Sequence, residues 1–295
     1  MKILKNEGCG ETRIAFIGQN GPEEIVIRRD LTLNFGDVVS AKITAYHELL
    51  HGYFAETARG AVFLPTSEPM AEGQTVLVKI TKEARADKDA TGCLATDEEI
   101  VPKAAGEDIS EDEMDELIAD AMQADVALAD GAELHIEQTK VCWTIDVDSG
   151  KSIRPIREIN QKSCTEIARQ IRLKNMGGLI LVDFVGSKYG QKQLEQKMAK
   201  AMADDMLATV KGWTRAGLLE IERKRTRADL WQSCSDKNPV AVYYRVRRAI
   251  GRVKSGNPYV FVSPEVFHLL QKSDVRAKLE PIFDKQISYF EIKEK

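Results

Sequence analysis

The hydrophobic pattern of this sequence changes along the chain, and this change constrains the fold more than any other feature. Residues 1–34 alternate apolar and polar positions around the turn signal Gln19-Asn20-Gly21-Pro22, which predicts a β-hairpin. The segments GDVVSAKITAY, GYFAET, AVFLP and TVLVKITKEA follow, with turn residues between them. About five short strands without a long helix predict a small closed barrel, for which the OB-fold is the usual solution.

The second half of the chain has the pattern of an α/β unit. From Ala132, two strands (AELHIEQ and VCWTIDVD) precede a helix (CTEIARQIRLKN), a strand (GGLILVDF) and a long helix (KQLEQKMAKAMADDMLATV). This alternation predicts a sheet with packed helices. A last unit begins near Pro239, with a helix (VAVYYRVRRAIGRV), a strand (YVFVS), a helix from Pro264 (PEVFHLLQ) and a closing strand (QISYFEI).

An acidic segment lies between these two patterns. Ser110 and Glu113 form a capping-box signature, and apolar residues at helical spacing follow, which predicts one helix over about residues 110–128. Its acidic side is interpreted as solvated helix surface, with docking of a basic partner as the alternative. Glu98 to Asp130 carries a charge of −11, and the whole chain carries −4, which leaves +7 for the rest. The net charge therefore does not exclude a nucleic-acid partner.

The cysteines and the apolar segments indicate in which cellular compartment the protein is expected. The five cysteines are far apart and form no C-x-x-C pair, which indicates reduced thiols in a reducing compartment. No run approaches the roughly 18 apolar residues of a membrane span, and the first residues lack the apolar core of a secretory signal. We therefore expect a cytoplasmic location without a membrane partner.

Two carboxylates stand at the ends of apolar strands, Asp146 in VCWTIDVDSG and Asp183 in GGLILVDF. Catalytic groups in α/β sheets gather at the carboxyl ends of strands, so two neighbouring strands would bring these aspartates together. Mg²⁺ binds to one or two carboxylates and to phosphate oxygens, which is the arrangement of a phosphodiester hydrolysis site. An aspartate at a strand end is also a common turn former or helix cap.

Basic and aromatic residues favour an RNA partner. Arg169 and Arg172 share one face of a predicted helix and are candidates for gripping a phosphate backbone, with a solvated helix surface as the alternative. Tyr53, Phe54 and Phe63 lie in predicted barrel strands, with Lys82 and Lys88 nearby. Aromatic rings beside a basic groove hold single strands in such barrels, although each ring is also a candidate for the core.

Taken together, these residues resemble a known family. The runs ELHIEQTKVCWTIDVDSG, REINQKSCTEIARQIRLKNMGGLILVDF and AGLLEIERKRTRADL are similar to the catalytic core of the ribonuclease E/G family. GDVVSAKITAYHELLHGYFAETARGAVFLP followed by EGQTVLVKITKEA resembles the S1-type OB-fold of that family, and FVSPEVFHLL resembles its small C-terminal domain. The resemblance covers nearly the whole chain except about residues 97–130.

The resemblance implies an α+β fold in which an S1-type OB-fold β-barrel interrupts an RNase H-like subdomain, joined to a DNase I-like α/β catalytic subdomain and a small C-terminal α/β domain. The expected ranges are 1–34 and 98–131 for the RNase H-like subdomain, 35–97 for the barrel, 132–234 for the catalytic subdomain and 235–295 for the C-terminal domain.

The resemblance also implies an activity. The expected function is endonucleolytic hydrolysis of single-stranded, A/U-rich RNA in RNA processing or decay, leaving 5′-phosphate and 3′-hydroxyl ends. By motif position, Asp146 and Asp183 match the two magnesium-binding aspartates, and Phe54, Phe63 and Lys88 match barrel positions that hold RNA. Mn²⁺ is the expected substitute for Mg²⁺, and a homodimer is compatible with the family.

Departures from the family pattern carry expectations of their own. Asp148 stands where the family usually has asparagine, and we include it among the catalytic residues. The 5′-phosphate sensor domain is missing between barrel and core, and the arginine-bearing D-R-A-R run reads DDMLA, so we predict cleavage independent of 5′-end phosphorylation. Only Cys234 remains of the cysteine pair that forms the family's zinc link, so we predict no structural zinc.

Two other functions fit parts of the sequence. A non-catalytic RNA-binding protein would keep the barrel and the basic surface but lose turnover through changes such as Asp148. A scaffold would use the acidic helix to dock a basic partner.

Overall fold

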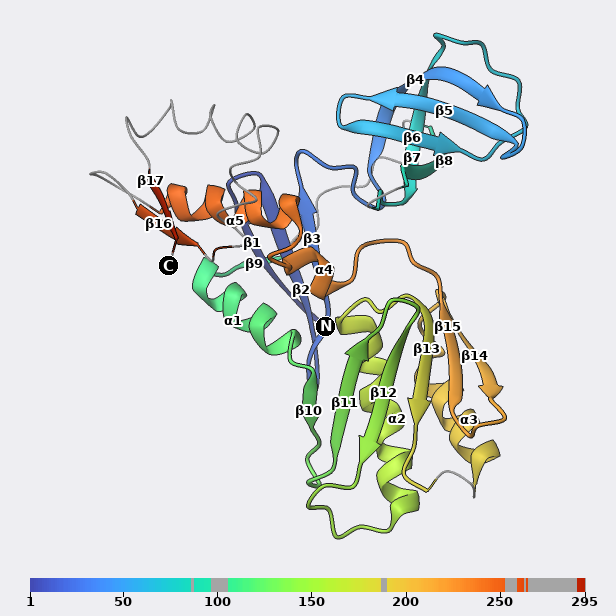
Figure 1. Cartoon of the computed structure of the whole chain (residues 1–295), viewed down its shortest axis with the longest axis vertical. Helices are drawn as coiled ribbons and strands as arrows, with labels where there is room; N and C mark the ends of the chain where they lie inside the picture. The colour runs from blue at the N-terminus through green and yellow to red at the C-terminus, as the bar shows by residue number, and fades with distance from the viewer. Residues whose placement is uncertain are drawn as a thin grey trace.

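The computed structural model describes residues 1–85, 88–96, 106–186, 190–252, 259–262, 264 and 291–294. Their strands form a four-stranded sheet, a six-stranded sheet, a two-stranded pair and a closed barrel (Figure 1). The mixed α+β class agrees with the sequence prediction. The assignment of these units to RNase H-like, S1-type and DNase I-like subdomains stays a prediction.

The first sheet contains strands from both sides of the barrel. Its order is β3-β2-β1-β9, with β9 parallel to β1. The predicted hairpin is β2–β3, in which Gly18 and Gly21 are register partners across the turn, whereas β1 is a strand that the sequence analysis did not separate. The strands are β1 (Lys2–Gly8), β2 (Glu11–Gly18), β3 (Gly21–Arg29) and β9 (Glu107–Asp108).

The barrel closes in the order β4-β5-β6-β8-β7, with β7 pairing back to β4. Alternate residues such as Ile43, Val62 and Ile80 fill its interior, so the intervening side chains point outward. This closed five-stranded barrel agrees with the predicted OB-like fold, and β8 is a fifth strand with no separate prediction. The strands are β4 (Val38–His47), β5 (Gly52–Thr57), β6 (Gly60–Leu64), β7 (Thr75–Lys82) and β8 (Ala90–Leu94).

The acidic segment forms α1 (Glu111–Ala121), which covers the first sheet. The predicted capping box is present, because Ser110 Oγ accepts from the Glu113 backbone N–H at 3.2 Å and the Glu113 carboxylate accepts from the Ser110 N–H at 2.9 Å. The helix ends seven residues before the predicted residue 128, because Asp125–Ala127 forms β10 and pairs with the next sheet. β10 thus belongs to the six-stranded sheet, and the predicted domain boundary after residue 131 stays a prediction.

Three acidic residues of α1 pair with arginines of the protein. Arg248 of α5 (Pro239–Gly251) lies 2.9 Å from Glu111. Arg252, directly after this helix, lies 3.0 Å from Glu111 and 3.3 Å from Asp112 and Asp115, and Arg13 of β2 also pairs with Asp115. These ion pairs connect the end of α5 to α1 and neutralise part of the charge run within the protein. Docking of a basic partner stays a prediction.

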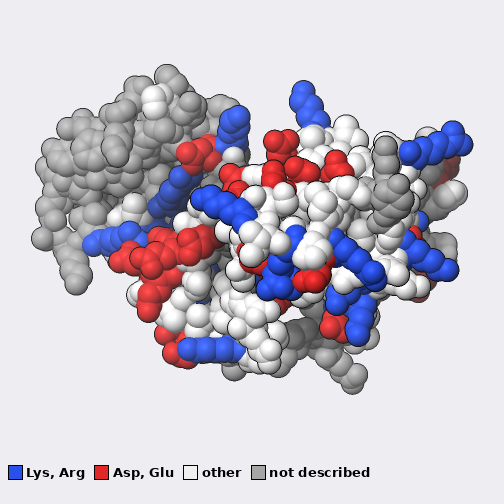
Figure 2. All heavy atoms as spheres, turned by 90° about the horizontal axis from the view of Figure 1, so that it is seen from below, with Lys and Arg blue, Asp and Glu red and all other residues white. Residues whose placement is uncertain are grey.

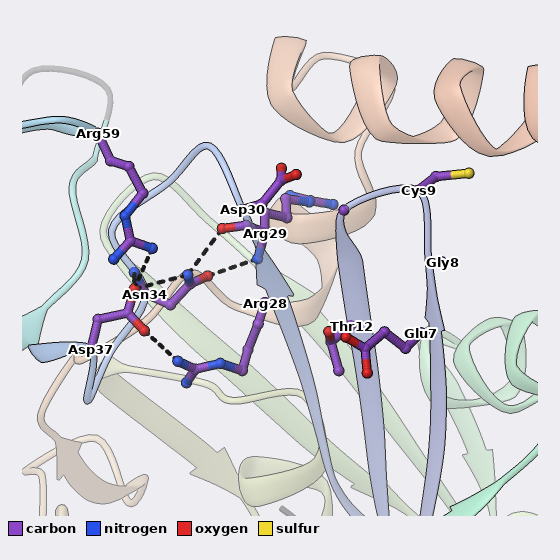
Figure 3. Close-up of a pocket in the computed structure, with 11 residues that line it drawn as sticks. Glu7, Gly8, Cys9, Thr12, Arg28, Arg29, Asp30, Asn34, Asp37 and Arg59 are labelled. Atoms are coloured by element: carbon purple, nitrogen blue, oxygen red, sulfur yellow. Dashed lines mark hydrogen bonds and ion pairs between the residues drawn. The ribbon is translucent and has the colours of Figure 1, made fainter. Parts of the chain in front are cut away.

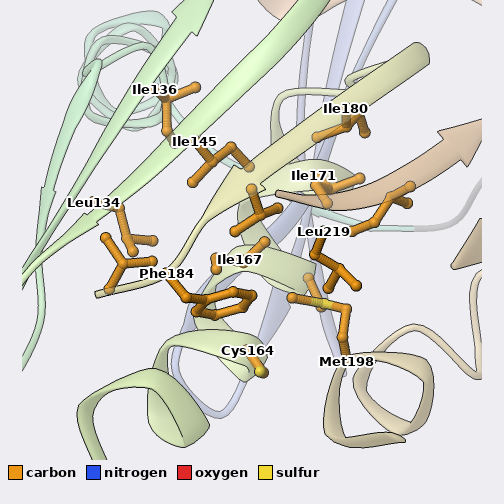
Figure 4. Packing of buried hydrophobic residues seen from close by; sticks show 14 of the residues in the cluster. Leu134, Ile136, Ile145, Cys164, Ile167, Ile171, Ile180, Phe184, Met198 and Leu219 are labelled. Atoms are coloured by element: carbon orange, nitrogen blue, oxygen red, sulfur yellow. The ribbon is translucent and has the colours of Figure 1, made fainter. Parts of the chain in front are cut away.

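The six-stranded sheet has the order β10-β11-β12-β13-β15-β14, and α2 and α3 cover one of its faces (Figure 1). Ile145, Ile180 and Leu219 of the sheet pack against Ile167 and Ile171 of α2 (Figure 4). The elements are β11 (Glu133–Gln138), β12 (Cys142–Asp148), α2 (Ile156–Leu173), β13 (Gly178–Asp183), α3 (Gln191–Ala201), β14 (Ala208–Trp213) and β15 (Leu219–Arg223).

The predicted long helix over 192–210 is wrong in its second half. α3 ends at Ala201, and residues 208–213 form β14 instead. Asp205 ends the helical region by accepting from the Leu207 N–H at 3.0 Å, and its other oxygen pairs with Arg223 of β15 at 2.7 Å. Asp205 thus holds β14 beside β15. Helical periodicity in residues 192–210 does not reveal that β15 is the pairing partner of this segment.

The last unit agrees with the prediction where the structure describes it. α5 follows the short helix α4 (Leu230–Cys234), and β16 (Tyr259–Val262) pairs in parallel with β17 (Glu291–Glu294). The predicted helix from Pro264 and most of the predicted closing strand lie outside the described residues.

Glu83, directly after β7, connects three segments of the chain. Its carboxylate accepts from the Phe35 N–H at 3.0 Å and from the Ala228 N–H at 3.3 Å, and its own N–H donates to the Thr226 carbonyl at 2.9 Å. Burial raises the pKa of this carboxyl. This polar latch therefore joins the end of β7 to the β3–β4 connection and to the segment after β15.

Candidate active site and RNA-binding surface

Asp146 and Asp183 are register partners in the parallel strands β12 and β13. Side chains paired in this way point to the same face of a sheet, and both residues are exposed. Their neighbours Ile145, Val147 and Val182 are buried against α2 and α3, so the aspartates lie on the uncovered face. The two residues that the sequence analysis placed at strand ends are thus brought together.

The two carboxylates interact electrostatically. Partial burial raises the pKa of Asp146, and the neighbouring charge of Asp183 raises it further. Two like charges side by side without a cation repel each other, so the pair favours a bound cation. The donor set is made of hard carboxylate oxygens, which suits Mg²⁺ or Mn²⁺.

The described residues contain no group of three or more His, Cys, Asp or Glu side chains arranged to hold a metal. Mg²⁺ does not need such a cage, because it keeps several waters and binds through one or two carboxylates and substrate phosphates. The Asp146 and Asp183 pair fits this type of site. It does not offer the three or four protein ligands of a zinc site.

Asp148 lies on the same open face, two residues along β12. One of its oxygens accepts from the Gly150 N–H at 2.7 Å and so shapes the turn after the strand. Its charge also contributes to the raised pKa of Asp146. The residue thus combines the turn-forming role with a place at the edge of the site, and its catalytic role stays a prediction.

His135 is a member of this surface that the sequence analysis missed. It is the register partner of Asp146 across β11 and β12, and its Nδ1 lies 2.8 Å from Oδ1 of Asp125 on β10. The available signal was alternation, because Leu134 and Ile136 are buried and the histidine between them must face outward. The partner Asp125 had no such signal, because β10 was predicted as helix.

The barrel presents Phe54 and Phe63 on its outer surface. They are register partners on β5 and β6, with ring centroids 5.2 Å apart, and the His47 ring lies 5.9 Å from Phe54. A Cβ at Gly52 would lie 2.6 Å from Phe63 Cζ, so the glycine leaves room for this ring. The strands that correspond to β5 and β6 form the oligonucleotide-binding face of OB-folds. Tyr53, in contrast, packs against the barrel core.

Lysines flank the aromatic pair. Phe63 is the register partner of Thr91 on β8, which in turn faces Lys82 on β7. Lys88 is exposed in the connection between β7 and β8, where its backbone pairs with that of Arg85. This loop is one of the two that bind oligonucleotides in OB-folds. The geometry is that of a stacking platform with cations beside it.

Arg169 and Arg172 are engaged within the protein. The Arg169 guanidinium bonds to Glu166 and to the Pro22 carbonyl, and Arg172 lies 2.7 Å from Glu23. Both therefore join α2 to the start of β3, and α2 covers the sheet face opposite to Asp146. Their contact with RNA stays a prediction, and it would compete with these ion pairs.

A cavity of about 340 Å³ lies where the barrel meets the first sheet (Figure 3). Three arginines line it, but Arg28 and Arg59 pair with Asp37, and Arg29 pairs with Glu11 at 2.9 Å. Glu7 and Asp30 line the cavity together with Asp37, so its lining holds three carboxylates and three guanidinium groups. The cavity is therefore a joint between units rather than a site for a phosphate.

Cys234 ends α4 and is packed beside the first sheet and α1. Burial raises the pKa of its thiol to about 11, which disfavours the thiolate that binds zinc. The predicted absence of structural zinc stays a prediction.

A sequence model of the ribonuclease E/G family matches residues 73–226, more than half of the chain. The chain belongs to this family. The matched range includes Asp146, Asp183 and Lys88, while Phe54 and Phe63 precede it.

Three relatives illustrate the family likeness. Ribonuclease G of Escherichia coli (strain K12) is 29% identical over 193 residues, which cover 57% of this chain and 40% of that protein. The chloroplastic ribonuclease E/G-like protein of Arabidopsis thaliana is 31% identical over 180 residues, 57% of this chain and 17% of its own length. Ribonuclease E of Nostoc is 36% identical over 131 residues, 41% of this chain and 19% of its own length. The chain thus matches less than half the length of these relatives.

A solved multidomain protein with nucleic acid binding domains from Streptococcus pneumoniae covers 40% of this chain and 44% of its own, at 14% identity and a TM-score of 0.18. That score is too low to support a conclusion about the fold. Among the helices that the structure describes, none combines the length and apolar character required to cross a membrane.

Proposed function

We propose that this chain is a divalent-metal-dependent endoribonuclease that hydrolyses single-stranded RNA in RNA processing or decay. The register pairing of Asp146 with Asp183 on an exposed sheet face is the observation that carries the proposal. Family membership and the ribonuclease relatives support it. We further infer Mg²⁺ as the natural ion, with Mn²⁺ as a substitute.

In this proposal, different residues of the chain bind the metal ion and the RNA. Asp146 and Asp183 would hold the ion at the open face, and a bound Mg²⁺ supplies an activated water and positive charge beside the phosphate. Phe54 and Phe63 would stack unpaired bases, and Lys88 would neutralise a backbone phosphate. We expect 5′-phosphate and 3′-hydroxyl products and a preference for A/U-rich sequences.

The barrel and the carboxylates lie toward opposite ends of the molecule. In Figure 1 the carboxyl ends of β12 and β13 are at the lower end and the barrel is at the upper end. Seen from the lower end, acidic and basic side chains are interspersed rather than gathered in one basic patch (Figure 2). A substrate long enough to reach both sites would therefore be held by the barrel and cut at a distance.

We also propose cleavage that is indifferent to the 5′ end. Between the barrel and the six-stranded sheet, the described residues form only β9 and α1 before β10 begins. In the DDMLA run, Asp205 pairs with Arg223 inside the protein and the run itself contains no arginine. A cytoplasmic location and a homodimer stay predictions.

One experiment tests the activity. A fluorescent A/U-rich oligomer is incubated with Mg²⁺, with Mn²⁺ or with EDTA, in 5′-phosphate and 5′-hydroxyl versions. We expect cleavage with either ion, at similar rates for both versions, and none in EDTA. Tight, salt-dependent binding without cleavage under all conditions would instead favour the non-catalytic RNA-binding protein, for which the extra charge of Asp148 is the motivating feature.

A further inference from the structure

Four polar side chains form a row across the open face of the six-stranded sheet. Asp125 on β10, His135 on β11, Asp146 on β12 and Asp183 on β13 are register partners in successive strands. Neighbouring strands lie about 4.8 Å apart, so the row extends over roughly 14 Å. The imidazole therefore stands one strand away from Asp146 and two strands away from Asp183.

Asp125 fixes the orientation of His135. A carboxylate only accepts hydrogen bonds, so the 2.8 Å contact assigns the proton of this bond to Nδ1. The buried neighbours Leu134 and Ile136 anchor the strand on either side. Within the part of the chain that the structure describes, no protein group bonds to the second nitrogen, Nε2, although 39% of the side chain is exposed. Nε2 is thus available to a ligand on the open face.

The surroundings of Nε2 disfavour a second phosphate. Asp146 lies on one side of the histidine and Asp125 on the other, and the exposed Glu137 stands two residues along β11. An anion here would be repelled by three carboxylates, whereas a neutral hydroxyl would not. A ribose 2′-hydroxyl both donates and accepts, so it can bond to Nε2 in either protonation state of the ring.

Selectivity for RNA needs a contact of this kind. Stacking on Phe54 and Phe63 does not read the sugar, because every base has a π-face. In hydrolysis by water the 2′-hydroxyl forms no bond to phosphorus, so the proposed reaction does not require it. The barrel and the metal ligands therefore leave the choice between RNA and DNA to another group.

We propose that His135, oriented by Asp125, contacts a ribose 2′-hydroxyl beside the scissile phosphate and makes the catalytic face selective for RNA. This inference rests on the proposed nuclease function, because that function puts the phosphate next to Asp146 and Asp183. His135 is the residue that touches the substrate, and Asp125 is a positioning residue.

A deoxy scan tests the proposal. Oligomers of one sequence carry a single 2′-deoxynucleotide at each position in turn, and kcat/KM is measured for each with the wild type. We expect one position near the cut to lose about tenfold, the size of one neutral hydrogen bond. His135→Ala should abolish this difference at that position. His135→Gln, whose amide donates and accepts, should keep part of it, and Asp125→Asn should reduce it.

Matched controls separate the outcomes. Glu137→Gln changes the same face of the same strand and should keep the wild-type ratio, and RNA affinity in EDTA should be equal for all variants. If the wild type cleaves no oligomer, the proposed function fails. Two results would show that the assignment of His135 is wrong although the wild type cleaves. Either His135→Ala retains the same deoxy penalty, or its kcat/KM falls by the same factor for every oligomer. If the alanine variant does not fold, His135→Asn replaces it in the deoxy scan. Its side chain is polar but does not reach the position of Nε2, so it should abolish the same difference.

Discussion

The barrel and the six-stranded sheet use the same β alternation to build opposite kinds of surface. In the barrel, Val62 and Leu64 point inward and leave the Phe63 ring outside. In the sheet, Ile145 and Val147 point toward α2 and leave Asp146 outside. One surface offers aromatic rings to bases and the other offers carboxylates to a cation. Under the proposed function, binding and cleavage would therefore reside on separate faces and should respond separately to mutation.

The largest effect should come from the sheet. Asp183→Asn removes one of the two paired charges that would hold the ion, and the cleavage rate should fall by about a thousandfold, the scale of several kcal/mol of charge stabilisation. RNA affinity, measured by fluorescence anisotropy, should not change. Glu220→Gln, on β15 of the same face, is the matched control and should cleave normally. A loss of RNA affinity in Asp183→Asn would break the separation of the two faces.

The barrel should show the opposite response. Phe54→Ala and Phe63→Ala should each weaken RNA binding by about ten- to a hundredfold, because base stacking on a ring contributes roughly 1–3 kcal/mol. The cleavage rate at saturating RNA should stay near that of the wild type. Leu49→Ala, at an exposed apolar position of the β4–β5 turn, controls for loss of surface area alone. A variant with normal affinity and a reduced maximal rate would contradict the assignment of these rings.

Lys174 anchors the catalytic unit and should make its stability depend on pH. Its ammonium is buried, donates to the Ala121 carbonyl at 2.7 Å and to Gln170 Oε1 at 2.6 Å, and burial lowers its pKa from 10.5 to about 8. Between these two values the unfolded chain binds more protons, so stability should rise with pH in that window and be lost as pH falls through 8.

The matched measurement uses Lys174→Met. Relative to this variant, the wild type should gain up to about 3 kcal/mol in free energy of unfolding between pH 7 and pH 10.5, at 1.36 kcal/mol for each pKa unit. Urea unfolding of both proteins at several pH values gives the difference. A difference that does not vary with pH would show that the amine titrates normally in the fold.

Glu83 anchors the barrel, and its loss should have the smallest effect. Glu83→Ala leaves the Phe35 and Ala228 N–H groups without their acceptor, which should cost about 1–3 kcal/mol. Hydrogen exchange at these two amides should accelerate, while the barrel interior at Val62 and Ile80 stays protected. If hydrogen exchange accelerated equally throughout the barrel, Glu83 would stabilise the barrel fold itself rather than the attachment of the barrel to its neighbours.

The sequence predicted elements whose signal is local. The capping box at Ser110 and Glu113, the β2–β3 turn and the strands before Asp146 and Asp183 all lie where the pattern indicated. The errors occurred where a distant partner overrode the local pattern. Residues 208–210 continue an apparent helix but pair with β15, and residues 125–127 extend an acidic helix but pair with β11.

The candidate site divides in the same way. Strand ends and the family motif point to Asp146 and Asp183. The family resemblance points to Phe54 and Phe63, because aromatic content alone did not separate them from Tyr53. No spacing in the sequence places Asp125 beside His135, or engages Arg169 and Arg172 with the first sheet.

By itself, the sequence determined which side chains face outward, because the two-residue period of a strand is a property of adjacent residues. Only the tertiary structure decided which outward side chains are neighbours, since strand order and register depend on packing between segments far apart in the chain. The row from Asp125 to Asp183 exists because four strands pair in one register, and the ion pairs of Glu111 on α1 exist because α5 returns to it.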